Sequence, residues 1–462
     1  MANSLGIQWL SEAQSELDSL IAARIRQTLD MAVSAGASAA DIVFSESQNQ
    51  SLEAQGHRIS ENKISSSRIM GIRVEKDGRL GLSYSESMGE SDRRSMVEMA
   101  LRNSAFTKSD PSQGIQPQGS TLLPDCSAQY SDEQVSLEQK EALTLKLESV
   151  PLSRDKRVRV VPYNGFGESY SSRYVANSNG VFCYERSHGY SCYTYVLMEA
   201  DGEKASYGES HMSRHFADLD WEHCVDTALS ESALLLRARP IPGGSYDVIF
   251  TPESLAALFS CFEVIFSGFA AKNKVNPLRD KLGQIIAAEA LQILDMPRYA
   301  QSLHMQYFDA EGLVPQDLRL IENGVLKNFY HNCETARYFG VESNARGARG
   351  ARGGLGTAGN CLVIAPNTDS RGDVRSGEFL EILELNGLHS GCDATSGNFS
   401  LPCSGKLYRD GKMVQGVRDV TLAGNFYQML KQLSAVGAEL KTTGGRSFFS
   451  PDLRFAGLTL AA

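Results

Sequence analysis

Three arginines lie in one short glycine-rich segment, residues 344–356, which reads NARGARGARGGLG. They are Arg346, Arg349 and Arg352, and they recur at a spacing of three residues. Guanidinium groups bind carboxylates and phosphates, and glycines let backbone N–H groups approach an anion. The segment therefore predicts a mobile, functional loop that can hold an anionic group, with a solvated connector as the alternative.

Two further pairs of residues have spacings that suit metal ligands. His211 and His215 are four residues apart, which on a helix would let both imidazoles reach one ion. The first histidine is not followed by the glutamate of a metalloprotease helix, and the surrounding ASYGESHMSRHF predicts a strand that runs into a loop. His389 and Cys392 form the second pair. We expect polar surface histidines, and an enzymatic site built from these four residues stays open as an alternative.

A helix is predicted directly after Thr251, because threonine is a good cap residue and Pro252 suits the first helical position. Apolar residues then follow at the spacing of one broad helix face, which predicts a core helix. They are Leu255, Leu258, Phe259, Phe262, Ile265, Phe266 and Phe269. Glu263 is the only acid between Glu253 and Asp280, and we expect it to face solvent.

The composition is that of a globular protein, with 42% apolar and 22% charged residues. A net charge of −10 would repel a nucleic-acid backbone or an anionic membrane, so neither is an expected partner. The N-terminus lacks the pattern of a signal peptide, and no apolar run has the length of a membrane span. The nine cysteines contain no C-x-x-C pair and suit reduced thiols. We therefore expect a cytoplasmic protein.

The pattern along the 462 residues predicts an α+β protein of two domains. Residues 1–237 are expected to form an α/β-mixed domain with antiparallel hairpins, and residues 238–462 a mainly β domain. The boundary is placed at ARPIPGGSY, residues 238–246, which is rich in proline and glycine. Helical periodicity appears at 17–29, 91–103, 137–149 and 218–235. Asp-Gly or Asn-Gly pairs predict type I′ hairpins at 77–78, 179–180, 201–202, 323–324 and 410–411.

Several segments resemble the TldD/PmbA family. The clearest lie within residues 385–430, where GLHSG (387–391), SGNFS (396–400) and TLAGN (421–425) match the PmbA-type pattern. FDAEG at 308–312 and the Thr335-Ala336-Arg337 run resemble another region of the family. TldD-type chains of this family carry His-Glu-x-x-x-His on a helix and a cysteine near the C-terminus as zinc ligands.

The resemblance implies that the zinc helix corresponds to the one after Thr251. No histidine occurs between His223 and His304, and no cysteine follows Cys403, so all three ligands are missing. The chain is therefore expected to have no catalytic residues and no metal of its own, with zinc only in a TldD-type partner. The resemblance implies a non-catalytic PmbA/TldE-type subunit of a metalloprotease that cleaves unfolded peptides.

The partner is expected to be a TldD-type catalytic subunit in a heterodimer. The alternative is a homodimeric peptide-binding protein with no proteolytic role. Glycine-rich surfaces can accept an extended peptide by strand addition, which gives the candidate peptide-binding residues. These are Arg346, Arg349, Arg352, His389, Asn398 and Phe399.

Overall fold

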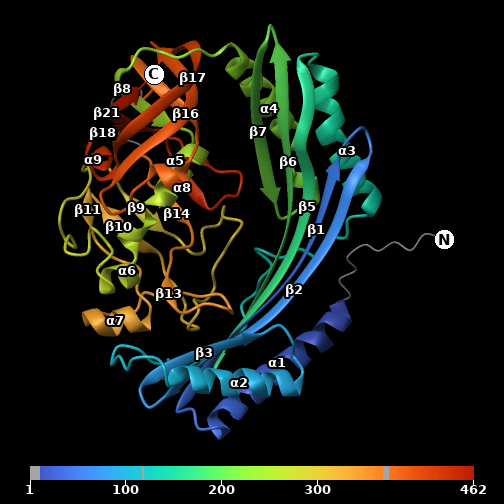
Figure 1. The fold of residues 1–462 in the computed structure, drawn as a ribbon, viewed down its shortest axis with the longest axis vertical. Coiled ribbons are helices and arrows are strands. Elements are labelled where there is room, and N and C mark those ends of the chain that lie inside the picture. Colours follow the sequence, from blue (N-terminus) through green and yellow to red (C-terminus); the bar gives the residue numbers. More distant parts are fainter. Residues whose placement is uncertain (1–10, 117–118, 368–373, 462) are drawn as a thin grey trace.

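The computed structural model describes residues 11–116, 119–367 and 374–461 (Figure 1). The first half is built on one strongly curved sheet with the strand order β3-β2-β1-β5-β6-β4, and β7 pairs with β6. All of its neighbouring strands are antiparallel except β4 and β6. The strands are β1 (Ala39–Ala54), β2 (Ile59–Lys76), β3 (Arg79–Ser85), β4 (Thr121–Leu122), β5 (Val158–Asn177), β6 (Phe182–Ala200) and β7 (Glu203–Ser213).

Two pairs of helices cover the two ends of this long sheet (Figure 1). Helices α1 (Ser11–Ser34) and α2 (Glu90–Ser104) pack at the end where β3 lies, around a cluster that contains Ile25 and Phe44. Helices α3 (Leu137–Arg154) and α4 (Trp221–Arg237) lie at the opposite end. The four helices predicted from periodicity are therefore confirmed; α1, α2 and α3 are longer than predicted, and α4 is shifted by two to three residues.

The predicted hairpins are all present, and four of them have the predicted turn. At Asp77, Asp201, Asn323 and Asp410 the residue and the glycine after it both have positive φ, as a type I′ turn requires. The β5–β6 connection differs, because only Gly180 has positive φ there. The side chain of Asn177 accepts the N–H groups of residues 179 and 181 and holds a different turn.

The second half is mainly β, and it contains a small barrel. Its strands follow the order β17-β16-β15-β8-β21-β18, and an additional pairing of β17 with β21 closes the sheet on itself. Helix α9 (Phe426–Lys431) follows β17 and is capped by the side chain of Asn425. The strands are β8 (Gly244–Phe250), β15 (Glu378–Leu385), β16 (Asn398–Arg409), β17 (Lys412–Asn425), β18 (Leu433–Val436) and β21 (Leu453–Ala461).

A second sheet of six short strands lies below the barrel in the same half (Figure 1). Helix α7 (Cys333–Phe339) and the ribbon of β12 (Gly347–Ala348) and β13 (Gly356–Thr357) lie next to it. The barrel and this sheet share one large hydrophobic cluster. The six strands are β9 (Ile293–Asp295), β10 (Leu318–Glu322), β11 (Val325–Leu326), β14 (Leu362–Ile364), β19 (Lys441–Thr442) and β20 (Phe448–Ser450).

The α+β class with a mainly β second half is thus confirmed. Within the described residues, no strand pairing joins the sheet of the first half to the sheets of the second. The division into two domains at residue 237 remains a prediction. No helix within the described residues is long and apolar enough to cross a bilayer.

The long apolar helix predicted after Thr251 is shorter than expected. Helix α5 (Pro252–Cys261) ends at Phe262, and the chain continues as a 3₁₀ turn, Glu263–Phe266, and the short helix α6 (Gly268–Lys272). Tyr330 separates the 3₁₀ turn from α6, because its backbone N–H donates to the Phe266 carbonyl and its carbonyl accepts the N–H of Gly268. The apolar residues predicted for the core are buried, apart from Phe269, which is half-buried, and Glu263 is exposed as predicted.

Candidate functional site

Arg346 lies fully inside the protein, in an ion pair with the equally buried Asp295. Its Nε donates to Asp295 Oδ2 at 2.5 Å, and its two Nη groups donate to the carbonyls of Asn344 and Gln316 at 2.7 Å each. The other carboxylate oxygen of Asp295 accepts the backbone N–H groups of Asn360 and Cys361. Arg346 therefore anchors the base of the 344–356 segment, and it has no surface that could meet a peptide.

The side chain of Arg349 contacts the sheet of the first half. Its Nη2 donates to Asp41 Oδ1 at 2.8 Å, and Arg73 binds the same carboxylate through Nε at 3.0 and 3.1 Å. All three side chains are buried. The chains approach so closely here that a Cβ on Gly71 would lie 1.7 Å from the Ala351 carbonyl oxygen. Arg349 thus joins the two halves of the molecule.

Arg352 is the exposed member of the series. It pairs with Glu86 and stacks over the ring of Tyr84, with 5.3 Å from its guanidinium carbon to the ring centroid. The three arginines therefore point to three different acids and form no common anion site. A spacing of three in an irregular loop does not place side chains on one face, and each acid lies far away in the sequence. Of the three, only Arg352 could still contact a peptide.

The other predicted peptide contacts lie around helix α8 (Leu388–Gly391). His389 is exposed on this helix, and Asn398 is exposed at the start of β16, where its Oδ1 accepts Asn425 Nδ2–H at 2.9 Å. Phe399 is buried in the barrel core. His389 and Asn398 remain predictions for peptide contact, whereas Phe399 packs inward and offers no surface for a peptide.

The four residues of the alternative metal site are not gathered. His211 lies on β7, as the predicted strand pattern required, and its Nδ1 accepts the N–H of Asp220. The Nδ1 of His215 lies 3.6 Å from a carboxylate oxygen of Glu133. Within the described part of the chain, no group of three or more His, Cys, Asp or Glu side chains is placed to hold a metal ion. The pair of His389 and Cys392 therefore lacks further ligands.

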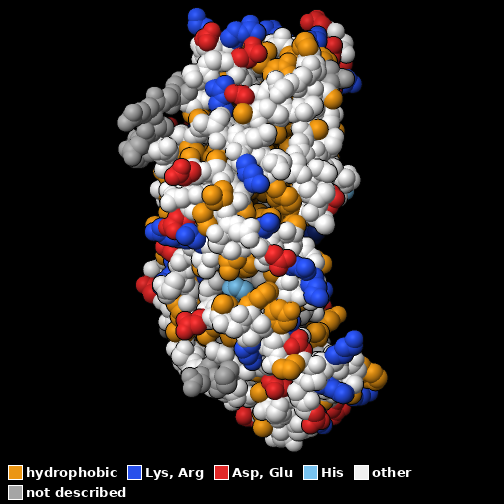
Figure 2. All heavy atoms as spheres, turned by 90° about the vertical axis from the view of Figure 1, so that its left-hand side faces the viewer, with side chains coloured by type: hydrophobic (Ala, Val, Ile, Leu, Met, Phe, Trp, Pro, Cys, Tyr) orange, Lys and Arg blue, Asp and Glu red, His pale blue; other side chains and the backbone are white. Residues whose placement is uncertain are grey.

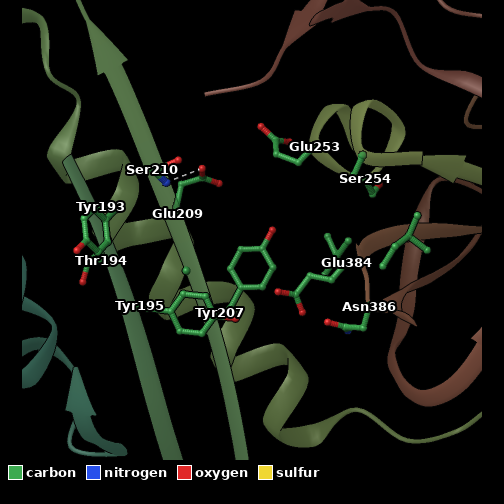
Figure 3. Close-up of a pocket in the computed structure, with 14 residues that line it drawn as sticks. Tyr193, Thr194, Tyr195, Tyr207, Glu209, Ser210, Glu253, Ser254, Glu384 and Asn386 are labelled. Carbon is green, nitrogen blue, oxygen red and sulfur yellow. Dashed lines mark hydrogen bonds between the residues drawn. The ribbon is translucent and has the colours of Figure 1, made fainter. Parts of the chain in front are cut away.

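A cavity of about 400 Å³ lies between the two halves of the molecule, beside helix α5 (Figure 3). One wall is formed by β6 and β7, and the other by α5 and the end of β15. Its polar lining is Tyr193, Thr194, Tyr195, Tyr207, Glu209, Ser210, Glu253, Ser254, Glu384 and Asn386. Sequence analysis missed this cavity, because its walls come from segments that are distant along the chain.

Three glutamates on three different elements face this cavity: Glu209, Glu253 and Glu384 (Figure 3). Burial raises the pKa of each carboxyl group. The Glu253 side chain is itself open to solvent, so we expect the smallest effect there. Burial and these acids also raise the pKa of Tyr207. No basic side chain belongs to the lining, so the cavity presents a negative wall with aromatic rings beside it.

Strand β7 contributes its backbone to the same cavity through Tyr207, Gly208, Glu209 and Ser210. Within the described residues its only strand partner is β6, so its second edge pairs with no strand. A free edge is a template to which an extended chain can add a strand. The cavity therefore combines a free strand edge with side-chain pockets, which suits an extended peptide.

Helix α5 has no histidine that could bind a zinc ion. The residues it turns toward the cavity are Glu253, Ser254 and Ala257, and none is a histidine. The Cys261 thiol, at the end of the helix, donates to the Ala257 carbonyl. Burial and the neighbouring Cys261 thiol raise the pKa of Cys392 to about 12. The residues present do not fit a catalytic zinc site.

The curved sheet and the small barrel are the fold of a metallopeptidase family. Three family models match: PmbA/TldA metallopeptidase domain 1 at residues 40–104, the central domain at 130–236 and the C-terminal domain at 243–462. The chain belongs to the PmbA/TldD metallopeptidase family.

Relatives within the family include PmbA and TldE proteins. The chain is 24% identical to the metalloprotease PmbA of Escherichia coli O157:H7, over 90% of this chain and 92% of the relative. It is also 24% identical to a PmbA homolog of Haemophilus influenzae, over 89% and 90%. The fold matches a proposed modulator of a DNA gyrase from Thermotoga maritima with a TM-score of 0.84 at 25% identity, over 95% and 99% of the chains. It matches TldE from Thermococcus kodakarensis with a TM-score of 0.81 at 23% identity, over 95% and 100%.

Proposed function

We propose that this chain is the non-catalytic, PmbA/TldE-type subunit of a metalloprotease that acts on unfolded peptides, and that a TldD-type chain supplies the zinc. One observation carries the proposal. Helix α5 borders a cavity with a free strand edge, yet it presents no residue set that could hold zinc. The subunit keeps a surface for an extended peptide, and the hydrolytic step belongs to its partner.

Peptide binding would use the second edge of β7. An extended segment can form main-chain hydrogen bonds with Gly208, while its side chains enter the cavity between β7 and α5. Main-chain recognition depends little on sequence, which suits substrates that share only the absence of a fold. An unfolded chain offers such a segment at any point, whereas a folded protein offers none.

The proposal is tested by co-purification with a TldD-type chain from the same genome. We expect a stable complex whose hydrolysis of fluorescein-labelled casein, an unfolded substrate, requires both chains and zinc. Zinc-dependent hydrolysis by this chain alone would contradict the proposal. A stable homodimer that ignores the TldD-type chain but still binds casein would support a homodimeric peptide-binding protein instead.

A side chain that fills the cavity should weaken the binding of a peptide. In an Ala257→Arg variant the new side chain enters the cavity from α5 and meets the glutamates of its walls. We expect at least a roughly tenfold weaker affinity for labelled casein in fluorescence anisotropy, since each 1.4 kcal/mol of lost binding is about tenfold. The matched control is Ser260→Arg, an exposed position on the same helix, which should bind like wild type. Equal affinities of the two variants would show that the peptide binds elsewhere.

We propose a cytoplasmic location and no direct contact with nucleic acid. All nine cysteines are free in the structure, as in a reducing compartment. The net charge is −10, and acidic and basic side chains are interspersed on the outer face of the second half (Figure 2). Nucleic-acid binding would need a basic patch, which this face does not offer.

A further inference from the structure

The segment FDAEG, residues 308–312, lies where the two halves meet. Both oxygens of Asp309 accept backbone N–H groups: Oδ1 accepts those of Glu311 and Leu313 at 2.9 and 3.0 Å, and Oδ2 accepts that of Gly347 at 2.9 Å. The preceding carbonyl, of Phe308, accepts Arg173 Nη2–H from β5 at 2.7 Å. This segment therefore connects the sheet of the first half to the arginine-glycine segment 344–356.

Glu311 is the unusual member of this joint. Its Oε2 accepts the Cys333 N–H at 2.7 Å, but its Oε1 has no hydrogen-bond partner among the residues that the structure describes. The side chain is only 4% exposed. A buried carboxylate oxygen without a donor is expensive to keep charged, whereas a protonated carboxyl group is not. We therefore place the proton of a neutral Glu311 on Oε1, the oxygen that accepts no hydrogen bond.

The surroundings of Glu311 hold charges of both signs. The positive groups are Arg73 on β2 and Arg349 in segment 344–356, and both already share the carboxylate of Asp41 on β1. Asp309 lies on the same segment as Glu311, and the thiol of Cys333 on α7 faces it, close to Glu334. A Cβ on Gly347 would lie 2.9 Å from Asp309 Oδ2 and 3.2 Å from Glu311 Oε2, so the backbone of segment 344–356 covers both acids.

The direction of the proton equilibrium follows from these contacts. Burial and the neighbouring Asp309 raise the pKa of Glu311 to about 7, and Arg73 only partly offsets them. Burial acts on Asp41 in the same direction, but Arg349 and Arg73 outweigh it and hold its pKa below the ordinary value. Both arginines thus bind Asp41. Burial raises the pKa of Asp309 too, but three backbone N–H groups donate to its carboxylate and oppose this rise, whereas Glu311 accepts only one, so we assign the proton to Glu311.

We propose that Glu311 is a proton-operated latch between the two halves of the molecule. With a proton on Glu311, segment 344–356 lies closed over Asp309 and Glu311 and holds Arg349 against Asp41. When the proton leaves, two adjacent buried carboxylates repel each other, and the segment opens. The opening of segment 344–356 does not depend on the proposed function. An effect of this opening on the peptide cavity, which also lies between the two halves, does rest on that function.

The latch is tested by hydrogen–deuterium exchange of the intact protein at pH 6 and pH 8, corrected for the intrinsic pH dependence of exchange. A folded-state pKa above that of the open state means that closure is favoured at low pH and lost as the pH rises toward 7. The opening constant of the amides in segment 344–356 should then rise about tenfold between the two pH values. The Glu311→Gln variant, which cannot titrate, should show no such rise.

The control is Glu61→Gln, an exposed acid on β2, which should behave like wild type. Protection of the β1–β5 amides reports whether each variant is folded. A pH-independent opening in the wild type would overturn the proposal, and so would the same tenfold rise in Glu311→Gln. If Glu311→Gln does not fold, a wild-type opening constant that does not change between pH 6 and pH 8 still overturns the proposal.

Discussion

An Asp295→Ala variant is expected to lose about 3–5 kcal/mol of unfolding free energy, the usual cost of removing one partner of a buried ion pair. Asp295 and Arg346 are both 0% exposed. Without the carboxylate, the guanidinium of Arg346 would keep its hydrogen bonds to three backbone carbonyls but would have no counter-charge. The backbone N–H groups of Asn360 and Cys361 would also lose their acceptor. Urea unfolding followed by circular dichroism measures the loss.

Asp280→Ala is the matched control for this prediction. Asp280 also pairs with an arginine, Arg279, but its side chain is 82% exposed. Exposed pairs contribute at most about 1 kcal/mol, because water solvates both partners. A loss of less than 1 kcal/mol for Asp295→Ala, equal to that of the control, would show that the 344–356 segment does not depend on this pair.

Asp41→Asn is expected to produce a loss of similar size, about 3–5 kcal/mol, at the interface of the two halves. Two buried arginines share this one carboxylate, so an amide would leave Arg73 and Arg349 close together without their counter-charge. The pKa of Asp41 is lowered in the fold, so its contribution is present at neutral pH and is lost as the pH falls through that value. The difference between variant and wild type should therefore shrink in acid.

Limited proteolysis adds a local measurement to the unfolding curve. Release of Arg349 from β1 should expose segment 344–356, which contains three arginines, and trypsin should cleave it faster in Asp41→Asn than in wild type. Glu86→Gln is the control, since it removes the partner of the exposed Arg352 only. Equal cleavage rates in Asp41→Asn and Glu86→Gln would contradict a special role for the buried pair.

Features set by local interactions could be predicted from the sequence. Whether an Asp-Gly or Asn-Gly pair forms a type I′ turn depends mainly on the φ angles of those two residues. The helices at 91–103 and 137–149 follow from the periodicity of apolar residues within their own segments. The apolar run after Thr251 was predicted as one helix, but Tyr330, far along the chain, takes backbone groups of Phe266 and Gly268 and so separates the 3₁₀ turn from α6. The family and the missing zinc ligands were also accessible, because they depend on which residues are present.

The arginine-glycine segment shows what the sequence could not reveal. Arg346 and Arg349 meet acids that lie 51 and 308 residues away along the chain, so their spacing carried no information about burial. The cavity was missed for the same reason. Glu209, Glu253 and Glu384 stand on a strand, a helix and another strand, and each is unremarkable in its own segment. Only the fold brings their carboxylates together.

The closed barrel has a consequence for how the molecule is made. Strand β8 leaves the ribosome early in the second half, but both of its neighbours, β15 and β21, are synthesised much later. Until they emerge, β8 and the apolar face of α5 have no partners, and exposed strands of this kind favour aggregation. The curved sheet of the first half is complete by then. We expect the nascent chain to be most dependent on chaperones while its second half is being translated.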